Sequence, residues 1–257
     1  MAFKKTKDHL KILLLQIRDG PKVRQEEHES FAQYSGLRLE QITILNVFDS
    51  PNFSTNIIND YDALFVGGAS EASVLEPETY PFIQTSIDLL KHCININLPV
   101  FASCFGFQLA VLALDGLIIR DSRNFEMGTL PISLTEEAQQ DALFHDTPNN
   151  FYAVSVHKEK SEIVPTTCTE LAFTKACCHS FRVKNKPFWA FQFHPEVDRI
   201  TLVERLTFFK DTYTKNNSHL QEILDHAVET PESNGLLNKF IERVVIRNLP
   251  QIKSDKD

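Results

Sequence analysis

The stretch "LPVFASCFGFQLAVLALDG", residues 98–116, decides how the chain folds. The apolar run before Cys104 predicts a buried strand, and the residues that follow are typical of a helix. A buried strand that passes directly into a helix indicates a parallel sheet whose two faces are both covered.

The same alternation of apolar strands and helices fills the first half of the chain. The predicted strands there are 10–17, 41–48, 61–68 and 99–104, and the predicted helices are 26–37 and 81–94. In the second half, the sequence predicts shorter, antiparallel-type strands at 128–136 and 151–157 and further strands at 170–176, 179–184 and 187–196. Amphipathic helices are predicted at 199–213 and 234–249. We therefore expect a three-layer α/β fold, with a mostly parallel open sheet flanked by helices and a small antiparallel extension. Residues 1–213 would form the domain and 214–257 a C-terminal helical extension, whose last helix either packs on the sheet or serves a partner.

Composition and charge exclude several classes of protein. The 257 residues carry a net charge of −8 and contain no basic stripe interleaved with aromatic residues, so we expect neither nucleic acid nor a membrane as partner. The apolar run 12–15 follows lysines as in a signal peptide, but it is short and broken by Gln16, so a first strand is the better interpretation. Five cysteines form no paired framework, which fits a reducing, cytoplasmic compartment.

A zinc site can be considered around Cys168, Cys177, Cys178 and His179. The adjacent ligands at 177–179 do not have the usual spacing of zinc-binding cysteines. Sequence reasoning therefore predicts no metal site here, and it predicts no cofactor elsewhere.

Cys104 stands between two small residues, Ala102 and Gly106. This small–x–nucleophile–x–small pattern lets a nucleophile occupy a strained turn between a strand and a helix. The start of the helix would stabilise a thiolate, and the backbone N–H of Phe105 would face a developing oxyanion. An ordinary tight turn around a buried cysteine is the alternative.

Two further motifs end predicted strands. In "FWAFQFHPEV" (188–197), His194 and Glu196 share one face of an extended backbone that Pro195 makes rigid, so the carboxylate can orient the imidazole. In "FVGGAS" (65–70), Gly67 and Gly68 permit close approach of a substrate and offer N–H groups to an oxyanion. Taken alone, each motif could be a plain turn. Because the carboxyl ends of parallel strands form one crevice, we expect the motifs to meet there.

The motifs "VGGAS", "CFGFQ" and "FQFHPEV" resemble, in order and approximate spacing, those of class I (triad-type) glutamine amidotransferases. The resemblance covers roughly residues 10–213. Within the family, the sequence is most similar to the free-standing, GMP-synthase-like group. It departs from the family where "GGA" stands for the usual "GGP", and where Val156 replaces a serine before His157.

The resemblance implies a flavodoxin-like fold and a Cys-His-Glu triad. Cys104 would attack the side-chain amide of glutamine or a related γ-glutamyl compound, and His194, oriented by Glu196, would move the protons. Gln108 would help to bind the γ-glutamyl group, and His157 would either line the same pocket or be a structural histidine at a strand end. A thioester intermediate would release glutamate and ammonia or an amine.

The destination of the nitrogen stays open at this point. Many members of the family supply ammonia to a synthetase, and this chain contains no phosphate-binding loop motif for ATP. Three hypotheses follow: a free-standing glutaminase or γ-glutamyl peptidase, a glutaminase subunit that needs a separate synthetase for activity, and a non-catalytic relative that binds a partner or metabolite. The intact set of Cys104, His194 and Glu196 argues against the third.

Overall fold

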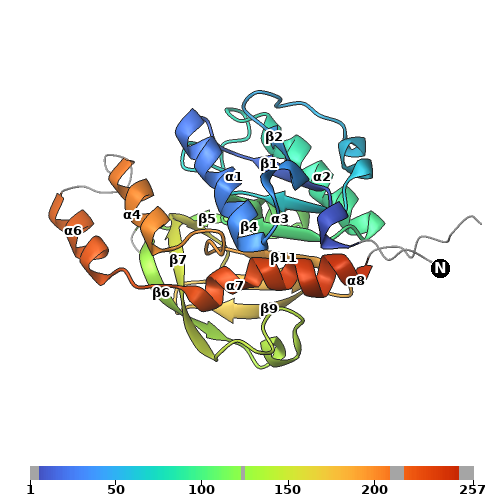
Figure 1. Cartoon of the computed structure of the whole chain (residues 1–257). Helices are drawn as coiled ribbons and strands as arrows, with labels where there is room; N and C mark the ends of the chain where they lie inside the picture. The colour runs from blue at the N-terminus through green and yellow to red at the C-terminus, as the bar shows by residue number, and fades with distance from the viewer. Residues whose placement is uncertain (1–5, 123–124, 209–216, 249–257) are drawn as a thin grey trace, which may run out of the picture.

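The computed structural model describes residues 6–122, 125–208 and 217–248. A nine-stranded sheet forms its middle layer (Figure 1). In spatial order the strands are β2 (Ile42–Asn46), β1 (Ile12–Gln16), β3 (Ala63–Val66), β4 (Val100–Ser103), β11 (Phe188–Phe191), β10 (Cys178–Val183), β9 (Cys168–Phe173), β6 (Glu126–Leu134) and β7 (Asn150–His157). A separate antiparallel pair consists of β5 (Ile119–Arg120) and β8 (Glu159–Lys160).

Helices cover both faces of this sheet (Figure 1). The α-helices are α1 (Pro21–Ser35), α2 (Phe82–Ile96), α3 (Phe105–Ala113), α4 (Arg199–Phe208), α6 (Asn217–His226), α7 (Pro231–Phe240) and α8 (Ile246–Asn248). The π-helical segment η5 (Ile241–Val245) joins α7 to α8, and the 3₁₀ segments are η1 (Lys7–His9), η2 (Leu39–Gln41), η3 (Thr55–Asp60) and η4 (Glu137–Gln140).

The sheet has a parallel half and an antiparallel half. Strands β2, β1, β3, β4 and β11 run parallel to their neighbours in that half, and β10, β9, β6 and β7 continue the same sheet in antiparallel pairs. This arrangement confirms the predicted α/β fold with its antiparallel extension. Strands β1, β3, β4 and β11 are buried at every residue, which explains their nearly continuous apolar sequence, whereas the edge strand β2 is partly exposed.

Strand β1 shows how the two faces divide the core. Leu13 and Leu15 belong to a core cluster with α2 and α3, whereas Ile12 and Leu14 belong to a second cluster with α1 and α7. Successive side chains of a strand point to opposite faces, so a run of consecutive apolar residues supplies both clusters.

Helix α7 completes the second of these clusters. The ring of Phe240 lies 5.4 Å from that of Phe101 and 6.3 Å from that of Phe65, measured between centroids. The last predicted helix therefore packs on the sheet, on the same face as α1 (Figure 1). The boundary between a domain ending at residue 213 and an extension from 214 stays a prediction.

Some predicted limits differ from the structure. Helix α1 begins five residues before the predicted start at 26, because Pro21 occupies its first turn, where a missing N–H costs nothing. It ends as predicted at Gly36, whose φ of 65° is left-handed. Helix α6 was not predicted, since the chain becomes polar there. The predicted ends at 213 and 249 lie outside the described residues.

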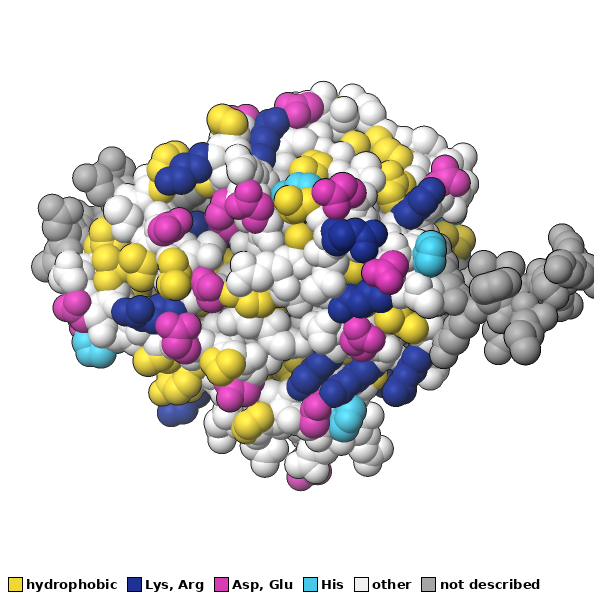
Figure 2. Space-filling view, in the orientation of Figure 1, with side chains coloured by type: hydrophobic (Ala, Val, Ile, Leu, Met, Phe, Trp, Pro, Cys, Tyr) yellow, Lys and Arg dark blue, Asp and Glu magenta, His cyan; other side chains and the backbone are white. Residues whose placement is uncertain are grey.

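The distribution of charge on the surface agrees with the absence of a basic stripe in the sequence. On the face seen in Figure 2, Lys and Arg side chains are interspersed with Asp and Glu rather than gathered by sign. Within the ranges that the structure describes, each helix is too short or too polar to cross a membrane.

Candidate active site

Cys104 occupies a strained turn between β4 and α3. Its backbone has φ 50° and ψ −100°, outside the regions that L-residues usually adopt. Among the described non-glycine residues, three others have positive φ, and all are Asn or Asp, which tolerate it. Strain at a cysteine is held in place by surrounding structure and is typical of functional sites.

The neighbours of Cys104 hold this turn. The Cys104 N–H donates to the carbonyl of Phe191 on β11, with the two atoms 2.7 Å apart. A Cβ at Gly106 would lie 2.9 Å from both the side chain and the carbonyl oxygen of Val66, so only glycine lets α3 start this close to β3. The small residue two positions after Cys104 is thus required sterically, as the sequence pattern predicts.

His194 and Glu196 follow β11 and are buried. Nδ1 of His194 and Oε1 of Glu196 are 2.7 Å apart, the distance of a charge-assisted hydrogen bond. Burial lowers the pKa of His194, but the negative charges of Cys104 and Glu196 outweigh burial and raise this pKa to about 9. Burial likewise opposes ionisation of Glu196, but His194 lowers the pKa of this carboxyl. We call Cys104, His194 and Glu196 the thiol site.

Gly68 lies between the members of the thiol site. A Cβ there would be 2.8 Å from Cε1 of His194 and 3.4 Å from Cβ of Cys104, so a side chain would displace one of them. The neighbouring Gly67 has a different role, because its N–H donates to the carbonyl of Leu15 within the sheet. Of the two glycines, only Gly68 therefore remains a candidate for an oxyanion donor.

A cavity of about 380 Å³ opens over the Cys104 side chain. Phe105, Gln108 and His157 line it as well, so the structure brings these predicted substrate-binding residues together with Cys104. Nε2 of Gln108 and Nδ1 of His157 both donate to the carbonyl of Glu159, at 3.0 and 3.1 Å. The size of the cavity suits a small molecule such as an amino acid.

A buried ion pair packs against the loop that contains Gly67 and Gly68. Nε of Arg18 donates to Oε1 of Glu27 at 2.8 Å, and a Cβ at Gly67 would lie 2.7 Å from the same carboxylate. Burial raises the pKa of Glu27, with Arg18 acting against this rise. Sequence reasoning missed both residues, since one arginine after a strand and one glutamate in a helix give no local signal.

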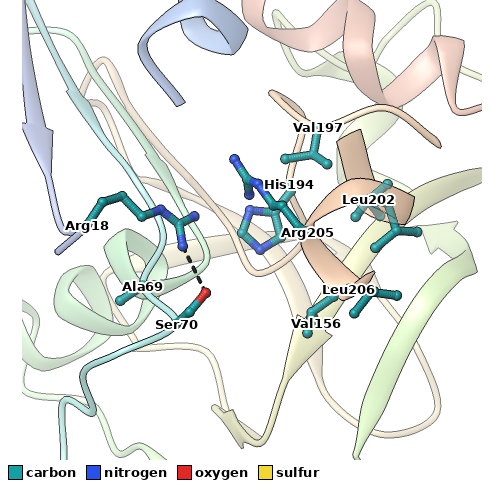
Figure 3. A pocket seen from close by; sticks show the side chains of 10 residues that line it. Arg18, Ala69, Ser70, Val156, His194, Val197, Leu202, Arg205 and Leu206 are labelled. Carbon is teal, nitrogen blue, oxygen red and sulfur yellow. Dashed lines mark hydrogen bonds between the residues drawn. The ribbon is translucent and has the colours of Figure 1, made fainter. Parts of the chain in front are cut away.

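His194 also lines a second, much smaller cavity. In Figure 3 its ring lies between Arg18 on one side and Leu202 and Leu206 on the other. Nη1 of Arg18 donates to Oγ of Ser70 there, at 3.1 Å. The imidazole thus interacts with the Cys104 side chain and also lines a compact, partly apolar cavity.

His157 contacts a carboxylate behind the cavity wall. Its Nε2 lies 3.1 Å from Oε2 of Glu126, which is also 2.9 Å from Nε2 of His179. Burial lowers the pKa of His157, and Glu126 counteracts this only in part. Burial also disfavours the Glu126 carboxylate, but its interactions with the imidazoles of His157 and His179 prevail and lower its pKa.

This site occurs within a recognised sequence family. The sequence pattern described as glutamine amidotransferase class-I matches residues 29–210. The chain belongs to the class-I glutamine amidotransferase family. The match includes all three members of the thiol site, so the resemblance read from three short motifs extends over most of the domain.

Curated relatives of this amidotransferase have more specific names. It is 31% identical over 138 residues to the GMP synthase (glutamine-hydrolyzing) of Borrelia garinii subsp. bavariensis, covering 52% of this chain and 26% of that protein. It is also 31% identical over 117 residues to a glutamine-hydrolyzing GMP synthase subunit of Methanocaldococcus jannaschii, covering 43% of this chain and 60% of that protein. The chain therefore spans about a quarter of the first relative and under two thirds of the second.

Solved structures show the same fold over nearly the whole amidotransferase. A glutamine amidotransferase from Thermotoga maritima superposes with a TM-score of 0.75 at 18% identity, covering 92% of this chain and 98% of that one. One from Methylobacillus flagellatus superposes with a TM-score of 0.71 at 16% identity, covering 97% and 98%. At these identities the likeness establishes the fold alone.

Proposed function

We propose that this chain hydrolyses the side-chain amide of glutamine through a thioester on Cys104. The observation that carries the proposal is the strained backbone of Cys104, whose side chain lines the cavity and interacts with His194, the partner of Glu196. A cysteine with no chemical role would not be expected to hold a disfavoured φ.

The first half of the reaction forms the thioester. The Cys104 sulfur attacks the amide carbon, and the carbonyl oxygen becomes an oxyanion that the N–H groups of Gly68 and Phe105 would stabilise. With its pKa raised to about 9, His194 is protonated at neutral pH and can donate a proton to the departing nitrogen. The carbon–nitrogen bond breaks and ammonia leaves.

The second half releases glutamate. His194, now neutral, accepts a proton from a water molecule that attacks the thioester carbon. The carbon–sulfur bond breaks, and the thiolate and imidazolium are restored. Glu196 keeps the ring oriented and stabilises its charged form in both halves, because its carboxylate is 2.7 Å from Nδ1.

The substrate would be held by the walls of the cavity. Gln108 and His157 both contact the carbonyl of Glu159, so they form one connected wall beside the sulfur of Cys104. Because this cavity is open to solvent, a γ-glutamyl peptide or amide is the alternative donor, in which case an amine leaves in place of ammonia.

A second candidate is a glutaminase subunit that works only with a separate synthetase. The relatives whose names describe one subunit of a GMP synthase favour it, since such a name denotes one part of an enzyme. The departure to Ala69 in the "GGA" loop gives such dependence a physical basis, because a partner could align the Gly68 N–H on docking.

One assay separates these functions. The full chain is incubated with glutamine and with a panel of γ-glutamyl peptides, with and without a GMP synthase synthetase subunit, while glutamate, ammonia and free amine are measured. Cys104→Ala is the test variant, and Cys168→Ser, a substitution outside the cavity, is the control. Release by the chain alone that Cys104→Ala abolishes supports the free-standing enzyme, and release only with the synthetase supports the second candidate. Equal behaviour of wild type and Cys104→Ala with every substrate and partner would overturn the proposal.

A further inference from the structure

A second group of Cys, His and Glu side chains lies behind the wall of the substrate cavity. It gathers at the ends of β6, β7 and β10 and consists of Glu126, His157, Cys177 and His179, here called the strand-end cluster. One donor atom from each residue lies within 4.8 Å of every other. The antiparallel pairing of β6 with β7 places Glu126 directly opposite His157, so the sheet itself brings these two together.

The donor atoms have separations suited to one small metal ion. Oε2 of Glu126 is 2.9 Å from Nε2 of His179, 3.1 Å from Nε2 of His157 and 3.5 Å from Sγ of Cys177. Around a tetrahedral zinc ion, Zn–N and Zn–S bonds of about 2.0–2.3 Å place neighbouring ligand atoms about 3.3–3.6 Å apart. The remaining donor atoms lie within 4.8 Å of one another, so the side chains would rotate toward the ion to reach that geometry.

The orientation of His157 prepares it for a metal. Its Nδ1 is 3.1 Å from the carbonyl oxygen of Glu159, and a carbonyl can only accept, so this nitrogen carries the proton. Nε2 then has a lone pair that points into the cluster. Among the described residues this buried Nε2 finds no hydrogen-bond partner of good geometry, although Glu126 is near. A backbone carbonyl that fixes the ligating tautomer of a histidine is the usual outer-shell arrangement of metal sites.

Glu126 is held in a comparable way. Oγ1 of Thr174 donates to its Oε1 at 2.8 Å, which leaves Oε2 facing the two imidazoles and the thiol. The ammonium of Lys160, on β8, donates to Asp121 at 2.8 Å and to the carbonyl of Ala176 at 3.1 Å. The carboxylate is therefore oriented by a hydrogen bond on one oxygen and directed at the other ligands by its second oxygen.

The kinds of donor select the metal. Two imidazole nitrogens, one thiolate and one carboxylate form a mixed set that suits Zn²⁺, whereas Mg²⁺ and Ca²⁺ prefer oxygen ligands throughout. One thiolate and one carboxylate also match the charge of a divalent ion when both histidines are neutral. Four protein ligands leave no open coordination position, which is typical of a structural zinc site.

We propose that Glu126, His157, Cys177 and His179 bind one Zn²⁺ in tetrahedral geometry. On binding, the Cys177 sulfur loses its proton to solvent and bonds to the metal, while both histidines bind as neutral ligands. The sequence led us to expect no metal, because we weighed only ligands close in the chain. Two of the ligands, Glu126 and His157, lie far from the cysteines in sequence, and the sheet brings all four to one place.

The position of the site gives the metal a function. His157 lines the cavity over Cys104 and also belongs to the strand-end cluster, so zinc would fasten this wall of the cavity to β6 and β10. The competing explanation is a hydrogen-bonded network without metal, in which Glu126 accepts from His179, Thr174 and Cys177.

Metal titration of the full chain distinguishes these explanations. We would use the Cys104→Ala chain, because the thiol and imidazole of the thiol site could themselves bind zinc. After removal of metal by a chelator, zinc is titrated against a competing indicator, and Co²⁺ is added separately as a spectroscopic probe. One equivalent should bind, with release of one proton, and Co²⁺ should give a thiolate-to-metal charge-transfer band and intense visible bands of tetrahedral cobalt.

Variants of single cysteines locate the site. Cys177→Ser should abolish the charge-transfer band and weaken zinc binding by more than the ~100-fold that loss of an outer-shell partner can cost. Cys168→Ser and Cys178→Ser, whose sulfurs lie outside the cluster, should retain both properties. No stoichiometric uptake by the Cys104→Ala chain would overturn the proposal, as would a charge-transfer band that survives Cys177→Ser. The spectrum of the chain with an intact cluster decides the question even if a cluster variant does not fold.

Discussion

The thiol site and the strand-end cluster contain the same kinds of side chain in different arrangements. In the thiol site, His194 interacts with the Glu196 carboxylate through Nδ1 and with the Cys104 side chain, so the three groups form a sequence along which a proton can move. In the strand-end cluster, the donor atoms converge on one point. The comparison teaches that Cys, His and Glu specify chemistry through geometry: an ordered line suits acid–base and nucleophilic catalysis, whereas a converging set suits a cation.

The largest expected effect concerns the two cysteines. Cys104→Ala should lower the rate of glutamine hydrolysis by at least about 10⁴-fold, because the covalent route is lost. Cys177→Ala should lower it by less than about 100-fold, the cost of a slightly misplaced cavity wall. Initial rates of ammonia release measure both. Similar losses of rate in the two variants would contradict the different roles given to Cys104 and Cys177.

The two carboxylates provide the next comparison. Glu196→Gln should reduce kcat by about 10³–10⁴-fold, since an amide can no longer stabilise the charged ring that it orients. Glu126→Gln should act mainly on KM, because this carboxylate contacts the cavity only through His157. Steady-state kinetics on folded variants give the split. A Glu196→Gln enzyme with unchanged kcat would remove Glu196 from the proposed mechanism.

The raised pKa of His194 predicts a pH dependence of stability. Its pKa in the folded chain is about 9, above the usual value of about 6.5, so the stabilisation is fully present below pH 6.5 and is lost as the pH rises through 9. The loss would amount to about 3 kcal/mol at most. Denaturant unfolding between pH 6 and 10 should show a steeper decline for wild type than for Glu196→Gln. Parallel curves would mean that Glu196 does not raise this pKa.

The smallest expected effect is that of zinc on stability. In the Cys104→Ala chain, free zinc at 100 times its Kd should stabilise the fold by about 2.7 kcal/mol. Cys177→Ser in the same background should show no such gain, whereas Cys178→Ser should. Thermal unfolding with and without a chelator measures the difference. A gain shared by all three chains would assign the zinc to another site.

Much of the fold could be predicted from the sequence because the parallel strands β1, β3, β4 and β11 are buried on both faces. The run from Ile12 to Leu15 is apolar at every position, and the structure divides these residues between two core clusters. The two-residue strands β5 and β8 were beyond such reasoning, since no periodicity exists in so short a segment. Helix α6 was missed for a similar reason, because polar residues dominate its sequence.

The candidate site likewise has parts that the sequence predicts and parts that it does not. The elbow at Cys104 and the pair formed by His194 and Glu196 are local patterns, so their geometry follows from residues adjacent in sequence. The ion pair of Arg18 with Glu27 and the strand-end cluster depend on strand order and register, which bring distant residues together. No spacing rule within one segment could have identified them.

The packing of α7 has a consequence for the order in which the protein can fold during synthesis. Strands β1 to β4 leave the ribosome first, but Phe65 and Phe101 on one face of them are covered by Phe240, which is made more than a hundred residues later. Until then, Phe31 of α1 covers part of this surface, with its ring 5.3 Å from that of Phe65, and the part left for Phe240 makes a nascent chain prone to association. Helix α7 therefore closes a core that strands made much earlier begin.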